Sequence, residues 1–135
     1  MVDMAQAATD WVAGVLGDVP CGFGDFPRGS GPACMVRASP GDPVVRRYVS
    51  GGGEYRFSYE VYLRCPARTD GERYDGLAAL RRVQAAIEHK ATWPDAEGVL
   101  WGSHECTQLP SLYRAEGTGH STYMLGAYVT WIERG

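Results

Sequence analysis

The sequence lacks the features that identify several large classes of protein. No apolar run approaches the ~20 residues of a membrane-spanning helix, and the first residues lack the basic-then-apolar layout of a signal peptide. Basic residues are not in excess, because 13 Lys and Arg stand against 16 Asp and Glu for a net charge of −3. We therefore expect a protein made in the cytosol, with no membrane partner and no basic surface for nucleic acid.

Cysteine is scarce and scattered, and no two cysteines form a C-x-x-C pair. The four thiols belong to Cys21, Cys34, Cys65 and Cys106. In a reducing cytosol this spacing predicts four free thiols, most of them buried.

The length and composition are those of a single globular domain, residues 1–135. The chain has 44% hydrophobic and 21% charged residues, and its length lets it bury a core without a disulfide or a metal. No internal repeat or low-complexity tail divides it. Glycine is the one excess, with 18 residues concentrated in the connections. Such loops suggest segments that order against a partner, with plain flexibility as the alternative.

The stretch 54–64 is the clearest structural signal in the sequence, because apolar and polar residues alternate along it. One set comprises Tyr55, Phe57, Tyr59, Val61 and Leu63, and the other comprises Glu54, Arg56, Ser58, Glu60 and Arg64. Alternation of this kind predicts a half-buried strand of an antiparallel sheet. Tyr62 is the exception, an aromatic residue on the polar face.

The remaining elements follow from helical spacing, alternation, capping residues and turn composition. We expect helices at 3–16 and 71–90, strands at 33–38, 44–50, 98–108 and 120–133, and connections at 20–32, 39–43 and 109–118. Two helices can cover one face of about five strands. The prediction is an α+β two-layer sandwich with a mixed, largely antiparallel sheet, whose second face is left to solvent or a partner.

Residues that carry chemistry give weak signals. His104 and Cys106, with His120 or Glu105, come nearest to a metal cluster, but no second ligand pair has a familiar spacing. Cysteine, serine and histidine form no local signature of nucleophilic catalysis. The glycines at 51–53 precede a strand and lack the following Lys-Ser/Thr of a phosphate-binding loop, and Gly22-Phe23-Gly24 fails in the same way. We therefore predict no catalytic, metal or cofactor site.

Arginine and tyrosine gather around the central strand, and both residue types are enriched in protein interfaces. The predicted contact face comprises Arg46, Arg47, Tyr48, Arg56, Tyr62 and Arg64. A solvated face is the alternative for any single member. A base-stacking platform would need a basic groove as well, which the net charge disfavours.

Four segments together resemble a known family. They are Pro20-Cys21-Gly22-Phe23-Gly24-Asp25-Phe26-Pro27, RRYVSGGGEYRFSYEVYLR at 46–64, LAALRRVQAAIE at 77–88 and YVTWIER at 128–134. With the N-terminal helix, they are similar to the minor capsid and tail terminator proteins that join head to tail in long-tailed bacteriophages. The resemblance covers nearly the whole chain.

The resemblance implies a structural virion protein at the head–tail junction, without enzymatic activity. Such subunits form a head-to-tail ring, commonly a hexamer, that caps the tail tube and meets a head-side connector or stopper protein. We expect the lumen and tube contacts on loops 39–54 and 107–120, which adds Tyr113 and Arg114 to the interface residues, and neighbour contacts on the uncovered sheet face. DNA would pass through the lumen without specific binding, since a net-negative ring repels phosphates.

Two other interpretations remain open from the sequence. The first is another head–tail connector, completion or tube-like subunit. The second is a small cytosolic enzyme or ligand-binding domain, which a pocket holding His104, Glu105 and Cys106 together would favour.

Overall fold

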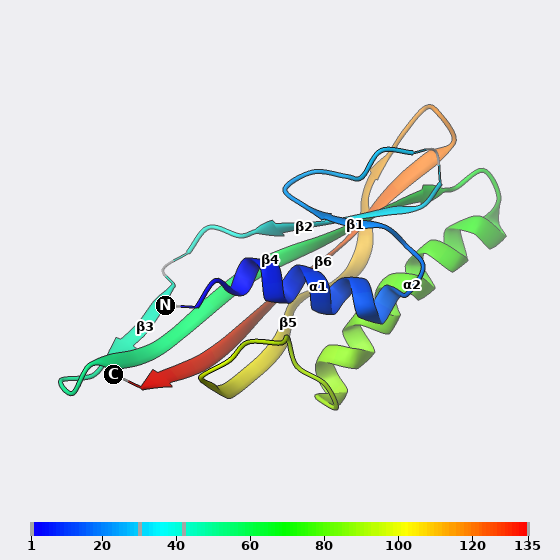
Figure 1. Ribbon diagram of the computed structural model, residues 1–135. Helices are drawn as coiled ribbons and strands as arrows, with labels where there is room; N and C mark the ends of the chain where they lie inside the picture. Colours follow the sequence, from blue (N-terminus) through cyan, green and yellow to red (C-terminus); the bar gives the residue numbers. More distant parts are fainter. Residues whose placement is uncertain (1, 30, 42, 135) are drawn as a thin grey trace.

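The computed structural model describes residues 2–29, 31–41 and 43–134 and shows two helices and a long twisted sheet (Figure 1). The elements are α1 (Met4–Leu16), β1 (Cys21–Phe23), β2 (Ala33–Ala38), β3 (Val44–Arg47), β4 (Gly52–Pro66), α2 (Asp70–His89), β5 (Val99–Ala115) and β6 (His120–Arg134). Ser30 in the predicted loop and Asp42 in the predicted turn lie outside the described residues.

The sheet has six strands in the order β1-β2-β4-β6-β5, and β3 also pairs with β4. The β1–β2 pair is parallel and the other pairs are antiparallel. Along its whole length β4 pairs with β6, so β2 and β3 share the other edge of β4, one behind the other. The predicted α+β class with a mixed, largely antiparallel sheet is confirmed.

Both helices begin and end within one residue of the predicted bounds. In α1, the Asp3 carboxylate accepts a hydrogen bond from the Ala5 amide at 3.2 Å, and Gly17 ends the helix with φ +76°. In α2, the Thr69 hydroxyl accepts a hydrogen bond from the Glu72 amide at 3.2 Å. These short-range contacts depend on local sequence, which explains why they could be predicted.

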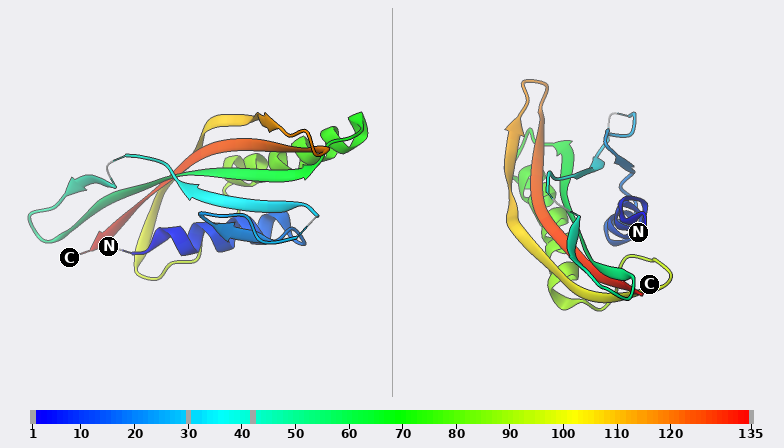
Figure 2. Two further views of the ribbon diagram at one scale, coloured as in Figure 1. Left: turned by 90° about the horizontal axis from the view of Figure 1, so that it is seen from above. Right: turned by 90° about the vertical axis from the view of Figure 1, so that its left-hand side faces the viewer.

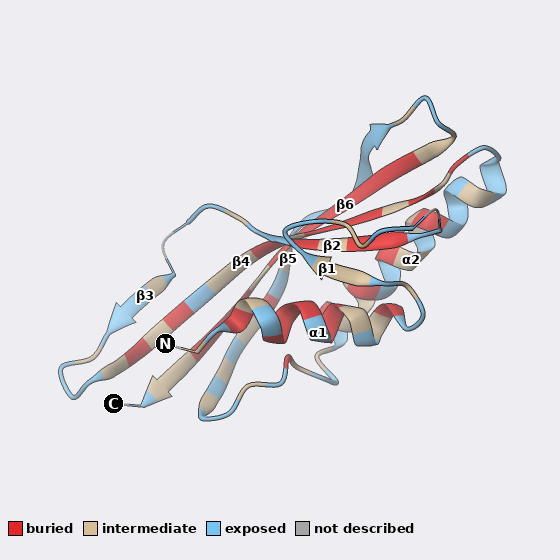
Figure 3. Cartoon of the chain, turned by 45° about the horizontal axis from the view of Figure 1, so that its top comes forward, coloured by how far each residue is buried: buried red, intermediate tan, exposed pale blue. Residues whose placement is uncertain are grey.

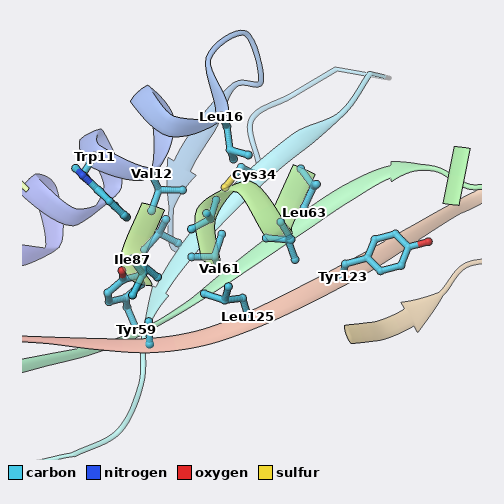
Figure 4. Packing of buried hydrophobic residues seen from close by; sticks show 14 of the residues in the cluster. Trp11, Val12, Leu16, Cys34, Tyr59, Val61, Leu63, Ile87, Tyr123 and Leu125 are labelled. Carbon is cyan, nitrogen blue, oxygen red and sulfur yellow. The ribbon is translucent and has the colours of Figure 1, made fainter. Parts of the chain in front are cut away.

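The core lies between the sheet and the two helices, which cover the same face (Figure 2). The register places Tyr59 opposite Ala127, Val61 opposite Leu125 and Leu63 opposite Tyr123, so the predicted apolar face of β4 continues across β6. Figure 4 shows the α1, α2 and strand side chains converging there, and Figure 3 shows the burial along the middle of the sheet. A second cluster around Tyr55, Val129 and Trp131 extends the core toward the start of α1.

The predicted strand at 98–108 is present but ends too early, and the predicted loop 109–118 is wrong, because β5 runs from Val99 to Ala115 and leaves a turn of 116–119. Four register shifts along β5 break its pairing with β6, and such bulges disturb the alternation of side chains. Pro110 also suggested a loop, but β5 is an edge strand, where proline is tolerated.

Two smaller differences concern the edge beside β2. The loop predicted at 20–32 contains the short strand β1, whose Cys21 lies opposite Cys34. The strand predicted at 44–50 ends at Arg47, where the chain turns back through Gly51 and Gly52, both at positive φ. All four cysteines are free thiols, with Cys34 and Cys65 buried.

Gly76 permits the close approach of α2 to the sheet. A Cβ atom added there would lie 2.5 Å from Cys65 Sγ and 2.9 Å from Tyr123 Cε2, whereas Gly14 on the exposed side of α1 has open space around it. We expect Gly76→Ala to lower the free energy of unfolding by about 1–3 kcal/mol through overpacking. Gly14→Ala should raise it by about 0.5–1 kcal/mol, the usual gain in a helix. Urea denaturation of both variants checks the opposite signs, and stabilisation by Gly76→Ala would contradict the packing.

Candidate assembly surface

The sheet face opposite the helices carries a cluster of four interacting side chains, which we call the arginine–tyrosine cluster: Arg37, Glu60, Tyr62 and Tyr113. The Arg37 guanidinium donates two hydrogen bonds to Glu60 Oε1, at 2.8 and 3.1 Å, and one to the Tyr62 hydroxyl at 2.7 Å. The guanidinium carbon also lies 5.0 Å from the centre of the Tyr62 ring. Tyr113 covers that ring edge-on, with centroids 4.9 Å apart.

This cluster explains why an aromatic residue is placed on the polar face of β4. Tyr62 is 2% exposed, because Tyr113 and Arg37 cover its ring, while Tyr113 itself is 55% exposed. The cluster therefore joins three strands, β2, β4 and β5, on a face that no helix covers. These contacts hold the side chains in place, so a partner that bound here would not have to order them first.

Two arginines of the predicted contact face interact with other residues of the same chain. Arg56 lies over the Tyr128 ring, with its guanidinium carbon 4.7 Å from the ring centre. Arg64 Nε lies 3.4 Å from Glu116 Oε2 near the β5–β6 turn. Arg56 remains exposed and Arg64 is half-buried, so both stay at the surface of this face.

The other predicted interface residues lie elsewhere. Arg46 and Arg47 are exposed on β3, and Tyr48 is half-buried in the turn that follows. Figure 1 shows that this β3–β4 hairpin extends beyond both helices at one end of the molecule. Arg114 is exposed near the end of β5, on the side of the molecule where α2 begins. The predicted set therefore divides between the hairpin and the uncovered face.

The sequence prediction missed Arg37, Glu60 and Tyr128. Glu60 and Tyr62 share a strand face by simple alternation, so that part of the cluster could have been found. Arg37 joins the cluster through the register of β2 against β4, which sets it beside Glu60. Tyr128 meets Arg56 through the register of β6 against β4, which sets it beside Ser58. Register between strands distant in sequence carries no local signal.

Large apolar side chains are exposed on β3, its turn and β5. They are Val45, Val49, Leu100, Leu109, Leu112 and Tyr113. Figure 3 shows these segments as mostly exposed, in contrast to the buried middle of β4 and β6. Exposed apolar residues gathered on edge strands are typical of surfaces that meet other chains.

His104, the residue closest to a metal or catalytic motif, is part of the core. It is 1% exposed, its Nε2 shares a 2.5 Å hydrogen bond with the Tyr59 hydroxyl, and its ring packs against Trp11 and Trp93. Burial, with a smaller effect of Lys90, lowers its pKa from 6.5 to about 4. The imidazole is therefore neutral at pH 7, and its Nε2 is already hydrogen-bonded to Tyr59.

The neighbours of His104 do not form a site with it. Glu105 forms an ion pair with Lys90 at 3.3 Å. His120 is the first residue of β6, whereas His104 lies opposite Val129, in the second half of β6. Burial and the nearby Glu88 and Glu105 raise the pKa of the Cys106 thiol to about 11, so the thiol stays protonated at neutral pH. Across residues 2–29, 31–41 and 43–134, no three His, Cys, Asp or Glu side chains converge to hold a metal ion.

Four surface hollows of about 230 to 350 Å³ are lined by other residues, and none includes His104, Glu105 or Cys106. One of them lies where β4 ends against the first turns of α2. In the part of the chain that the structure describes, no helix is both long and apolar enough to cross a membrane.

Solved structures share this fold over nearly the whole chain. A chain of the virion of a native gene transfer agent particle covers 95% of this chain and 95% of its own length, with a TM-score of 0.52 and 14% identity. A second solved chain, whose name states no activity, covers 98% of this chain and 92% of its own, with a TM-score of 0.50 and 16% identity. No protein-family model matches the sequence, and no curated protein matches it. At these identities the likeness shows a common fold.

Proposed function

We propose that this protein is a structural subunit of a tailed phage or phage-like particle, without enzymatic activity. In this proposal it forms a ring, commonly a hexamer, that caps the tail tube and joins it to the head-side connector. The observation that carries the proposal is the end-to-end fold match with a chain of a gene transfer agent virion. The match spans both chains, so the whole fold is shared, and the proposal rests on this analogy of fold.

The chemistry of the surface supports assembly. The arginine–tyrosine cluster, the projecting β3–β4 hairpin and the exposed apolar residues of β5 would supply the contacts. A subunit inside a ring meets a neighbour on each side, and in this proposal it also meets the tube and the connector at its ends. We propose that Arg46, Arg47, Tyr48, Arg56, Tyr62, Arg64, Tyr113 and Arg114 contribute to these contacts.

The net charge fits a conduit for DNA. With a charge of −3 per chain, a hexamer carries about −18, which disfavours binding of the phosphate backbone. DNA would pass through such a ring without being held. Filter binding of duplex DNA by the assembled ring tests this point, and tight retention at physiological salt would contradict it.

The same fold match supports a second structural role, another connector, completion or tube-like subunit of the particle. The two roles differ in where the subunit lies in the particle, because a terminator occupies the head-proximal end of the tail. The mass of the purified protein, alone and with tail tubes, together with an image of labelled subunits in the particle, tests the proposal. A protein that remains a monomer in both conditions and is missing from the particle would overturn it.

Charge reversal on the two arginine regions should impair assembly. We expect Arg47→Glu and Arg56→Glu to lower the yield of complete particles at least about tenfold, because each places a carboxylate where an interface arginine is proposed. Arg82→Glu on the exposed side of α2 is the matched control and should leave the yield unchanged. Counting infectious or gene-transferring particles after complementation measures the effect, and wild-type yields from both variants would refute the proposed contacts.

A further inference from the structure

We propose that the tip of the β3–β4 hairpin of one copy docks into the hollow at the opposite end of the next copy in the ring. The inference rests on the proposed ring and identifies its neighbour contact. We call residues 46–51 the hairpin tip. We call the hollow the acidic seat, lined by Val19, Pro32, Leu63, Cys65, Pro66, Glu72, Asp75, Gly76 and Ala79.

The hairpin tip combines positive charge with an unburied apolar side chain. Val49 is fully exposed at the turn, and Val45 is exposed on β3. Arg46 and Arg47 are exposed, and none of the ion pairs seen among the described residues includes them. The segment 44–53 contains no acidic residue, and Glu54, opposite Arg46 in the hairpin register, is not in an ion pair with it in the described chain. The tip therefore offers an apolar anchor beside two unpaired cations.

The tip is ordered before it meets a partner. The Gly51 amide donates a hydrogen bond to the Tyr48 carbonyl at 3.1 Å, and the Tyr48 amide donates one to the Gly52 carbonyl at 3.4 Å. Positive φ angles at Gly51 and Gly52 allow this tight turn. A preformed turn loses little conformational entropy when it binds, which favours its use as an insertion element.

The acidic seat has the complementary character. Its cavity of about 230 Å³ is mostly apolar and lies between the end of β4, the first turns of α2 and the segments beside β1 and β2. Glu72 and Asp75 stand on its lining. Glu72 is paired with Arg68 at 3.5 Å, but Asp75 is exposed and takes part in none of the ion pairs seen in the described chain. A valine side chain fits the space, and Asp75 offers the tip a free carboxylate.

The positions of tip and seat allow docking between copies and forbid it within one. They lie at opposite ends of β4, separated by roughly 40 Å of extended strand (Figure 1). One copy therefore presents its tip to the seat of a second copy, whose own tip is free for a third. A head-to-tail contact of this kind generates a closed ring when its rotation closes.

This contact assigns the hairpin tip to the ring interface, in place of the tube contact that the resemblance implied for loop 39–54. An apolar anchor in a pocket, surrounded by rim charges, is the usual form of an energetic centre in an interface. The rim charges would mainly steer and orient the encounter.

The test measures self-association of the purified full-length protein by sedimentation velocity. We expect Val49→Asp, and separately Arg46→Glu with Arg47→Glu, to weaken self-association about tenfold or more. Adding Asp75→Arg to the Arg46→Glu/Arg47→Glu chain should restore most of the loss by reversing both charges. Arg81→Glu with Arg82→Glu makes the same charge change on the exposed side of α2 and should have no effect. Circular dichroism confirms that each variant folds.

A cross-linking experiment tests the geometry directly. In a Cys65→Ala background, which removes the free thiol that lines the seat, Val49→Cys with Asp75→Cys should give a ladder of dimers and higher oligomers under a mild oxidant, whereas Val49→Cys with Arg82→Cys should not. Unchanged self-association in the tip variants, or equal ladders from both cysteine pairs, overturns the inference while leaving the proposed function in place. If the tip variants self-associate normally but no longer bind the tail tube, the tip is a tube contact, and this result also overturns the inference. A monomer that neither associates nor enters the particle overturns the proposed function itself.

Discussion

Acidification from pH 6.5 to pH 4 is expected to cost the folded protein about 3 kcal/mol through His104 alone. Burial lowers the pKa of this imidazole from 6.5 to about 4 in the folded state. Between these values the unfolded chain binds a proton that the folded chain excludes, so stability falls as the pH falls through this window. Well above pH 6.5 the histidine is neutral in both states and contributes no further change.

The groups around His104 define the controls. Its ring faces Tyr59 on β4, Trp11 on α1 and Trp93 before β5, with Lys90 and Cys106 nearby. The double variant Tyr59→Phe/His104→Phe removes both partners of the buried hydrogen bond and should be much less sensitive to pH between 6.5 and 4.5. Urea unfolding at a series of pH values measures the slope. An equal slope in the wild type and the double variant would show that other groups cause the loss.

Truncation of Tyr62 should be the most damaging change on the uncovered face. We expect Tyr62→Ala to lower the free energy of unfolding by about 3 kcal/mol, because it removes a buried aromatic ring from beneath Tyr113 and Arg37. Tyr62→Phe keeps the ring and loses its hydrogen bond with Arg37, at a cost of about 1 kcal/mol. Thermal and urea unfolding of the two variants measure the difference.

Tyr113→Ala separates stability from assembly. Tyr113 is largely exposed, so its truncation should cost about 1 kcal/mol or less of stability. In the proposed ring the same change removes part of the contact surface and should lower the yield of particles. A stable Tyr113→Ala variant with normal assembly would show that Tyr113 only covers Tyr62.

For Tyr62→Ala, a decrease in the free energy of unfolding below about 1 kcal/mol would show that the cluster is loosely packed.

The local sequence predicted the elements whose signals are short-range. The caps Asp3 and Thr69, the bounds of β2 and the alternation of β4 all depend on residues within a few positions of each other. β5 was the main failure, since its bulges interrupt the alternation and Pro110 resembles a loop signal. β1 was missed because three residues are too few to show a period.

For the candidate surface, alternation and residue type were sufficient to select Arg56, Tyr62 and Arg64 for the uncovered face and Arg46 and Arg47 for the hairpin. The partners of these residues were not predictable. Tyr62 was expected to be open to a partner, but Tyr113 buries it from a strand more than fifty positions later in the sequence. His104 was a candidate ligand until the fold placed it against Tyr59.

By itself, the sequence determined the two-layer α+β class, the helix ends and the face of β4 that is buried, because these follow from side-chain period and capping. The tertiary structure decided which strands pair and in which register. Register places Arg37 on Glu60 and Tyr62, extends β5 along β6, and sets the hairpin tip and the acidic seat at opposite ends of β4. Backbone hydrogen bonds between two strands can form at several registers, and packing of the whole core selects one of them. No local stretch of sequence therefore specifies the register.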